Sequence, residues 1–116
     1  MRTYCICRCL SIRHYGGTDP AKAHSHTIEI TAYIRTAEEK FEPFLGLEKY
    51  LDEYFEPYEN QLLNSMPEFH GDASIEGMGE VFFRGLAKSL EKRGLCLERL
   101  KVGETPLRRY IIGWRE

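Results

Sequence analysis

The apolar residues of this chain change their spacing along the sequence, and this change limits the folds that the chain can adopt. Up to about residue 35 they follow the alternation of strands that bury one face. From Phe44 to Leu90 they recur at the spacing of amphipathic helices, and two more strand-like segments come after Gly94. The order β-β-α-α-β-β predicts an α+β domain, in which an antiparallel four-stranded sheet carries two helices on one face.

The predicted elements have recognisable ends. The first two strands cover residues 3–13 and 23–35, with a loop of glycine, threonine, aspartate and proline between them. The first helix begins near Phe44 and ends or kinks at Pro57, and the second begins after the N-cap Ser74 and stops at Gly94. The last two strands cover residues 96–104 and 109–114. The apolar stripes of the two helices are Phe44, Leu47, Leu51, Phe55 and Tyr58, and then Met78, Val81, Phe82, Leu86 and Leu90.

Length and charge narrow the class of protein. The 116 residues suit a single domain spanning 1–116, and the formal net charge of −2 offers no basic surface for nucleic acid or an anionic membrane. No apolar run approaches the roughly 20 residues of a membrane span, and the first residues lack the layout of a signal peptide. We therefore expect a cytoplasmic protein. The open edges of a small sheet favour a homo-oligomer.

Three cysteines, Cys5, Cys7 and Cys9, alternate along the first predicted strand and share one face. The outer two would lie roughly 13–14 Å apart, so they cannot easily bridge one another. In a reducing compartment they act as small apolar residues. A metal site built from the three is the less favoured alternative.

The triplet His24-Ser25-His26 is the most informative feature for chemistry. On a strand, residues two apart face the same way, roughly 6.8 Å apart at Cα, so both imidazoles can reach one ion at about 2.0–2.1 Å. His14 ends the preceding strand, where an antiparallel neighbour brings it alongside. Three histidine ligands leave one position open, as in catalytic zinc sites. The alternative is that His24 and His26 form a polar strand end that binds no metal. The remaining histidine, His70, fits a solvated loop residue.

Several motifs along the chain resemble the 6-pyruvoyl-tetrahydropterin synthase family, which includes the 6-carboxy-tetrahydropterin synthases. A strand-end histidine followed by His-x-His resembles that family's zinc motif. The further matching segments, in the family's order, are Leu62-Leu63-Asn64, Ala73-Ser74-Ile75-Glu76 and Leu100-Lys101-Val102-Gly103-Glu104-Thr105-Pro106. Together they span nearly the whole chain.

This resemblance implies a tunnelling fold, often a hexamer, with active sites between subunits. It implies zinc held by His14, His24 and His26, and a substrate such as 7,8-dihydroneopterin triphosphate. In the matched Glu-Thr-Pro motif, Glu104 and Thr105 would bind the pterin. A carboxylate can accept two parallel N–H bonds from the amino-pyrimidine edge of the ring, which fits such a role.

The chain departs from the family where proton transfer is expected. The family's basic cysteine before His-x-His is absent, and Asp19 is the only local substitute, although it also suits a turn before Pro20. The family's Leu-Asp-His matches Tyr58-Glu59-Asn60, so the relay histidine is replaced by an asparagine that cannot carry a proton. Glu59 either keeps the acidic role of the family's aspartate or simply caps a solvated helix end.

His70 would replace the missing relay only if its loop folds over the site, and Cys9 is on the wrong face of its strand. Two interpretations follow. The first is a divergent pterin synthase or lyase in which zinc-bound water, Asp19 or His70 carries out the acid–base work. The second is a zinc-containing protein of this fold that binds a pterin or purine-like ligand without the family's reaction.

Overall fold

The computed structural model describes residues 2–36 and 41–113, and it confirms the predicted order of elements. The strands are β1 (Arg2–His14), β2 (His24–Thr36), β3 (Leu95–Thr105) and β4 (Arg108–Gly113). The helices are α1 (Phe44–Phe55) and α2 (Ile75–Glu91). Four short 3-10 turns, Pro20–Lys22, Glu56–Tyr58, Leu63–Ser65 and Pro67–Phe69, join these elements. Trp114, expected at the end of the last strand, lies outside the described residues.

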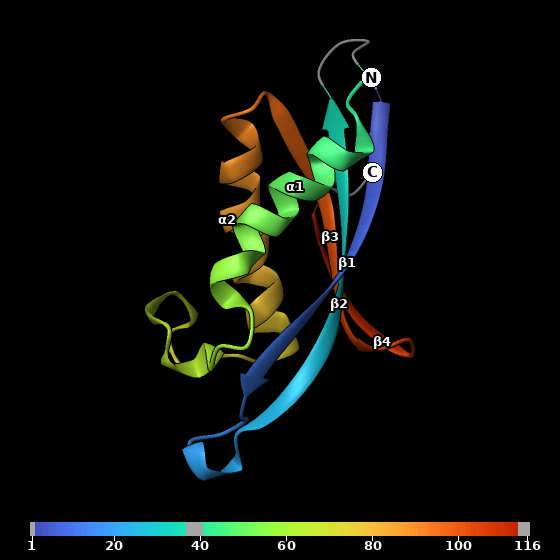
Figure 1. Ribbon diagram of the computed structural model, residues 1–116. Helices are drawn as coiled ribbons and strands as arrows, with labels where there is room; N and C mark the ends of the chain where they lie inside the picture. The colour runs from blue at the N-terminus through green and yellow to red at the C-terminus, as the bar shows by residue number, and fades with distance from the viewer. Residues whose placement is uncertain (1, 37–40, 114–116) are drawn as a thin grey trace.

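The four strands form one antiparallel sheet in the order β1-β2-β3-β4. Both helices lie on the same face of this sheet, and the β1–β2 hairpin extends beyond them (Figure 1). The β1–β2 register is unbroken from Arg2↔Thr36 to His14↔His24. Because that register is continuous, the even-numbered residues of both strands face the helices along their whole length.

The core lies between this sheet face and the two helices. Ile28, Ile30, Ala32 and Ile34 of β2 are fully buried there, as their alternation predicted. The helices contribute Leu47, Leu51 and Phe55 from α1, and Met78, Phe82, Leu86 and Leu90 from α2. Phe44 was wrongly expected in the core: it is 56% exposed, because it is the first residue of α1 and its ring only meets the edge of Tyr4.

The outer edge of β1 is partly covered by the segment that follows α1. The amide of Asn60 donates to the carbonyl of Ser11 at 2.6 Å, and the amide of Arg13 donates to the carbonyl of Gln61 at 2.9 Å. A parallel bridge joins Arg13 to Leu62. These bonds satisfy part of a strand edge that would otherwise be bare, and they fix the end of β1 that carries His14.

The face of the sheet opposite the helices carries the three alternating cysteines. Cys5, Cys7 and Cys9 are free thiols and exposed, and the Cys7 sulfur lies 3.6 Å from the Thr31 hydroxyl. Within the part of the chain that the structure describes, no helix has the length and apolar character needed to cross a membrane.

Candidate metal centre and adjoining pocket

Three imidazoles converge where β1 ends and β2 begins. His14 pairs directly with His24, and His26 lies two residues along β2 opposite Ile12, so all three side chains share the helix-facing side of the hairpin. Their candidate ligand nitrogens lie within 4.8 Å of one another. The ring centroids are 4.7 Å apart for His14 and His24, 5.6 Å for His14 and His26, and 5.8 Å for His24 and His26.

Backbone carbonyls orient two of these rings. His14 Nδ1 lies 2.9 Å from the carbonyl oxygen of Ala73, and His24 Nδ1 lies 3.3 Å from that of Lys22. A carbonyl can only accept, so in each bond Nδ1–H is the donor and Nε2 keeps its lone pair. Metal-binding histidines are commonly held in this way, with the other ring nitrogen bonded to a carbonyl or a carboxylate.

The cluster contains two polar atoms that the protein itself leaves unsatisfied. His14 Nε2 and His26 Nδ1 are both buried and have no hydrogen-bond partner. A buried polar atom without a partner costs about 1–3 kcal/mol. A metal ion among the three rings would accept both lone pairs, so the donor set and its burial fit such an ion.

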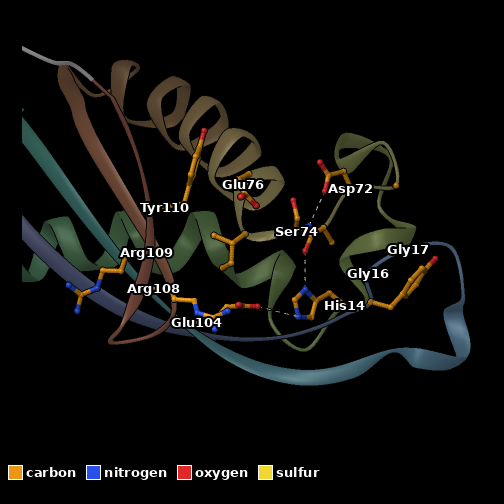
Figure 2. Close-up of a pocket in the computed structure, with 14 residues that line it drawn as sticks. His14, Gly16, Gly17, Asp72, Ser74, Glu76, Glu104, Arg108, Arg109 and Tyr110 are labelled. Carbon is orange, nitrogen blue, oxygen red and sulfur yellow. Dashed lines mark hydrogen bonds and ion pairs between the residues drawn. The ribbon is translucent and has the colours of Figure 1, made fainter.

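A pocket of about 500 Å³ adjoins the cluster and reaches it through His14 and Glu104. In Figure 2, contacts run from the His14 ring to Glu104 on one side and to the backbone before α2 on the other. The walls come from the loop after β1, the start of α2 and the β3–β4 turn. The other lining residues are Tyr15, Gly16, Gly17, Gly71, Asp72, Ala73, Ser74, Ile75, Glu76, Arg108, Arg109 and Tyr110.

Glu104 lies between this pocket and the histidines. Its Oε2 atom is 3.6 Å from His26 Nδ1 and 3.9 Å from His14 Nε2. Thr105, its partner in the predicted pterin site, lies outside the pocket lining, and its hydroxyl accepts a hydrogen bond from the amide of Leu107 at 3.1 Å. The two residues of the motif therefore have different surroundings: Glu104 faces the histidines, whereas Thr105 stabilises the β3–β4 turn.

Asp19 has a local bond in the hairpin loop. Its carboxylate accepts from the amide of Ala21 at 3.0 Å and so caps the short turn Pro20–Lys22. It is exposed, and it does not belong to the pocket lining, although Gly16 and Gly17 of the same loop do. This bond matches the alternative that the sequence offered for Asp19, a turn residue before Pro20. A catalytic role of Asp19 stays a prediction.

The other two acid–base candidates also lie outside the pocket lining. The Glu59 carboxylate accepts from Arg8 at 2.9 Å and from the amide of Ser11 at 3.0 Å, so both of its oxygens tie the end of the α1 region to β1. His70 is exposed, and its φ of 49° places it in the left-handed region at the end of the turn Pro67–Phe69. Neither geometry supports the predicted catalytic roles, which stay untested.

Sequence reasoning missed how the site is held in place. The Asn64 side chain accepts from the amide of Tyr15 at 3.0 Å and donates to the carbonyl of Tyr15 at 3.0 Å, which clamps the residue after His14. The Leu-Asn motif was visible in the sequence, but its role was not. A hydrogen bond to a backbone carbonyl, as at Ala73, leaves no signal in residue types.

The start of α2 holds the Ala73 carbonyl in position. Ser74 caps the helix as predicted, and its hydroxyl accepts from the amide of Gly77 at 3.0 Å. The Asp72 carboxylate accepts from the amide of Ser74 at 3.0 Å. Hydrogen bonds from Ser74 stabilise the carboxylate form and hold the pKa of Asp72 below its ordinary value. Residues 72–74 are thus fixed on both sides of the carbonyl that bonds His14.

Comparison with known proteins assigns the fold and then the family. The structure of 6-pyruvoyl tetrahydropterin synthase from Caenorhabditis elegans is similar, with a TM-score of 0.75 and 12% identity, over 98% of this chain and 96% of that one. An uncharacterized protein from Wolinella succinogenes has a TM-score of 0.62 and 8% identity, over 99% of this chain and 100% of that one. Likenesses at this level of identity establish the tunnelling fold.

The sequence itself establishes the family. A model of the 6-pyruvoyl tetrahydropterin synthase family matches residues 2–113, which is nearly the whole chain. The chain therefore belongs to the 6-pyruvoyl tetrahydropterin synthase family. No curated protein sequence matches it.

Proposed function

We propose that this protein is a zinc-dependent synthase or lyase of the pterin type, acting on 7,8-dihydroneopterin triphosphate or a related pterin. The observation that carries the proposal is the histidine cluster: two buried, unpartnered ring nitrogens converge beside a pocket of about 500 Å³. Family membership supplies the class of substrate.

His14, His24 and His26 would hold the zinc. Bound zinc supplies a Lewis acid that polarises oxygen atoms on the substrate's side chain. The chain's own contribution is orientation, because the Ala73 and Lys22 carbonyls hold the His14 and His24 rings with Nε2 available. Zinc is favoured over a harder ion because imidazole nitrogen is one of its preferred ligands.

Glu104 would bind the pterin ring. Its side chain is 28% exposed and lines the pocket, so a ligand there can reach it. An ionised carboxylate accepts two parallel N–H bonds from an amino-pyrimidine edge, which gives both affinity and orientation. Thr105 would contribute mainly by shaping the turn after Glu104.

Among the acid–base candidates, Asp19 is the one that we would test first. It lies two residues beyond Gly17, which lines the pocket, on the loop between β1 and β2. Glu59 has both oxygens engaged in bonds to β1, and His70 is held at the end of a turn. A rearrangement of the loop around Asp19 would break few bonds, since among the described residues its carboxylate accepts only from the Ala21 amide.

The positions of Asp19, Glu59 and His70 favour a second function. Since Asp19, Glu59 and His70 all lie outside the pocket lining, the protein would bind a pterin or purine-like ligand without converting it. In this alternative the zinc centre and Glu104 serve recognition alone. A homo-oligomer and a cytoplasmic location remain our expectations under either function.

One set of assays separates the two functions. We expect purified protein to carry about one zinc per subunit. Incubation with 7,8-dihydroneopterin triphosphate should then release triphosphate or cleave the side chain, whereas binding with no product supports the alternative. Turnover that survives Asp19→Asn discards this carboxylate as the base. Absence of zinc, together with a His24→Ala variant of unchanged stability and ligand affinity, would overturn the metal centre.

A further inference from the structure

We propose that Glu104 is the fourth ligand of the metal centre when no substrate is present, so that the resting site has three histidines and one carboxylate. The inference rests on the proposed function for the presence of the ion. Glu104 would occupy the coordination position that three histidines leave open.

The distances from Glu104 to two of the histidines fit a shared metal ion. Glu104 Oε2 lies 3.6 Å from His26 Nδ1 and 3.9 Å from His14 Nε2. Both distances exceed the roughly 2.7–3.2 Å of an N–H···O hydrogen bond. They suit two ligands of one ion, since bonds of about 2.1 Å in tetrahedral geometry separate neighbouring ligands by about 3.4 Å. The carboxylate oxygen is therefore near the position of a ligand without being a hydrogen-bond partner.

The Glu104 carboxylate faces ring nitrogens that have no hydrogen-bond partner. The two nitrogens that Glu104 faces, His14 Nε2 and His26 Nδ1, are the buried ring atoms that lack a partner. Among the described residues, Glu104 carries the only carboxylate within 4.0 Å of any of the three histidines. Three neutral imidazoles leave the charge of a divalent ion uncompensated in a partly buried site, and one carboxylate reduces that charge.

The backbone around Glu104 is irregular and aims the side chain at the histidines. The β3–β4 register shifts between Gly103 and Thr105, so Glu104 is the extra residue of a bulge. Bulges of this kind re-aim a side chain and are frequent beside active sites. Gly103 is needed there, because a Cβ atom would lie 2.9 Å from Arg109 Cγ and 3.1 Å from the carbonyl of Arg108. Its contacts with His14 and His26 place the Glu104 carboxylate on the helix-facing side with the histidines.

Two roles of Glu104 then compete. A carboxylate that is bonded to the ion cannot also grip the edge of a pterin ring. Entry of the ring would withdraw the carboxylate and free the coordination position for the side chain of the same substrate. Binding free energies are reciprocal, so metal and isolated ring should weaken each other's affinity by the same factor.

The test measures zinc affinity in the absence of any pterin, by competition with a chromogenic chelator. Even the outer partners of zinc ligands change metal affinity about 10- to 100-fold, so Glu104→Gln should weaken zinc binding at least about tenfold. Glu104→Asp keeps the charge but shortens the arm, and it should also lose affinity. The matched control is Glu29→Gln, because Glu29 lies on β2 opposite Gly103, on the other face of the sheet.

Substitution of cobalt for zinc gives a second readout. The visible absorption of cobalt reports its ligand set, so Glu104→Gln should change that spectrum and Glu29→Gln should not. If zinc affinity and cobalt spectrum are the same in Glu104→Gln as in the unaltered chain, Glu104 is not a ligand, and the proposed function stands without it. If Glu104→Gln lowers the zinc affinity but Glu104→Asp binds zinc as tightly as the unaltered chain, then Glu104 acts as a nearby charge and is not a ligand. If the unaltered chain binds no zinc, both proposals fall.

Discussion

At the scale of single residues, the histidine cluster is held in place by groups outside it. The Ala73 carbonyl orients His14, and the Asn64 amide holds the backbone of Tyr15 immediately after it. The cluster of His14, His24 and His26 was predictable from the sequence, because the residue types and their spacing carry chemical meaning. The carbonyl partners were not predictable, since any residue offers a carbonyl and only the fold decides where it points.

We expect Asn64→Ala to destabilise the fold and to weaken metal binding together. The substitution removes hydrogen bonds to both the amide and the carbonyl of Tyr15, and a lost bond to a half-buried backbone group costs about 1–3 kcal/mol. Urea unfolding measures the first effect and chelator competition the second. Gln61→Ala is the control, because that exposed side chain donates a hydrogen bond to the Glu59 carbonyl and none to Tyr15 among the described residues. Equal zinc affinity in both variants would contradict the positioning role.

At the scale of elements, the first turn of α2 lies close against the loop before it. A Cβ atom at Gly77 would clash with the backbone oxygen of Asp72, so this position requires glycine despite its location in a helix. The contact holds the loop that presents the Ala73 carbonyl to His14. Helix propensity would have favoured alanine here, and the close approach of the loop overrides it.

Gly77→Ala should therefore destabilise the protein and lower its zinc affinity. Alanine is the better helix former by about 1 kcal/mol, but the added methyl group must displace the backbone at Asp72. In α1, Gly46→Ala meets nothing closer than Pro43 Cγ at 3.7 Å, so it should be neutral or stabilising. Thermal unfolding of the two variants tests this contrast, and a stabilised Gly77→Ala would refute it.

The packing of Tyr54 against α2, and of Tyr58 against the segment that carries Glu68, can be followed by alkaline pH. Burial raises the pKa of Tyr54 to about 12, above its ordinary 10.0, and burial with a hydrogen bond to Glu68 raises the pKa of Tyr58 as well. The unfolded chain releases these protons first. Stability should be full below pH 10 and should fall as pH rises toward 12, by at most about 1.4 kcal/mol per unit per group.

Urea unfolding between pH 9 and 11 measures that decline. Tyr54→Phe should make it shallower, because the substituted group no longer titrates in either state. Tyr33→Phe is the control, since Tyr33 lies on the sheet face away from the helices. An identical pH dependence in unaltered protein and Tyr54→Phe would show that this phenol does not contribute.

At the scale of the whole molecule, the histidine cluster lies where the ends of β1 and β2 meet the loop before α2 and the end of β3. The β1–β2 hairpin extends past the helices (Figure 1). The three histidines lie where its strands end, before the connecting loop. Alternation and helical periodicity were enough to predict the fold, because they follow from which side chains must be buried. The bulge at Glu104 and the cover over β1 were not predictable, since both depend on segments distant in sequence.

Zinc should therefore raise the midpoint of thermal unfolding. A ligand that binds only the folded state adds about 4.1 kcal/mol to the free energy of unfolding when its concentration is a thousand times its Kd. Scans with added zinc and with chelator measure the shift, which should disappear in His24→Ala. This variant should still fold, because His24 is exposed. A midpoint that does not respond to zinc in the unaltered chain would contradict the coupling.

The partial cover over β1 decides where another strand could add to this sheet. Ser11 and Arg13 use their outward backbone groups for residues 60 and 61, so in an unbroken ladder Thr3, Cys5, Cys7 and Cys9 also point their backbone groups outward. A strand added there would run beside the three exposed thiols. Their alkylation rate therefore reports on assembly: it should fall as protein concentration rises if copies join along this edge, and stay constant if they do not.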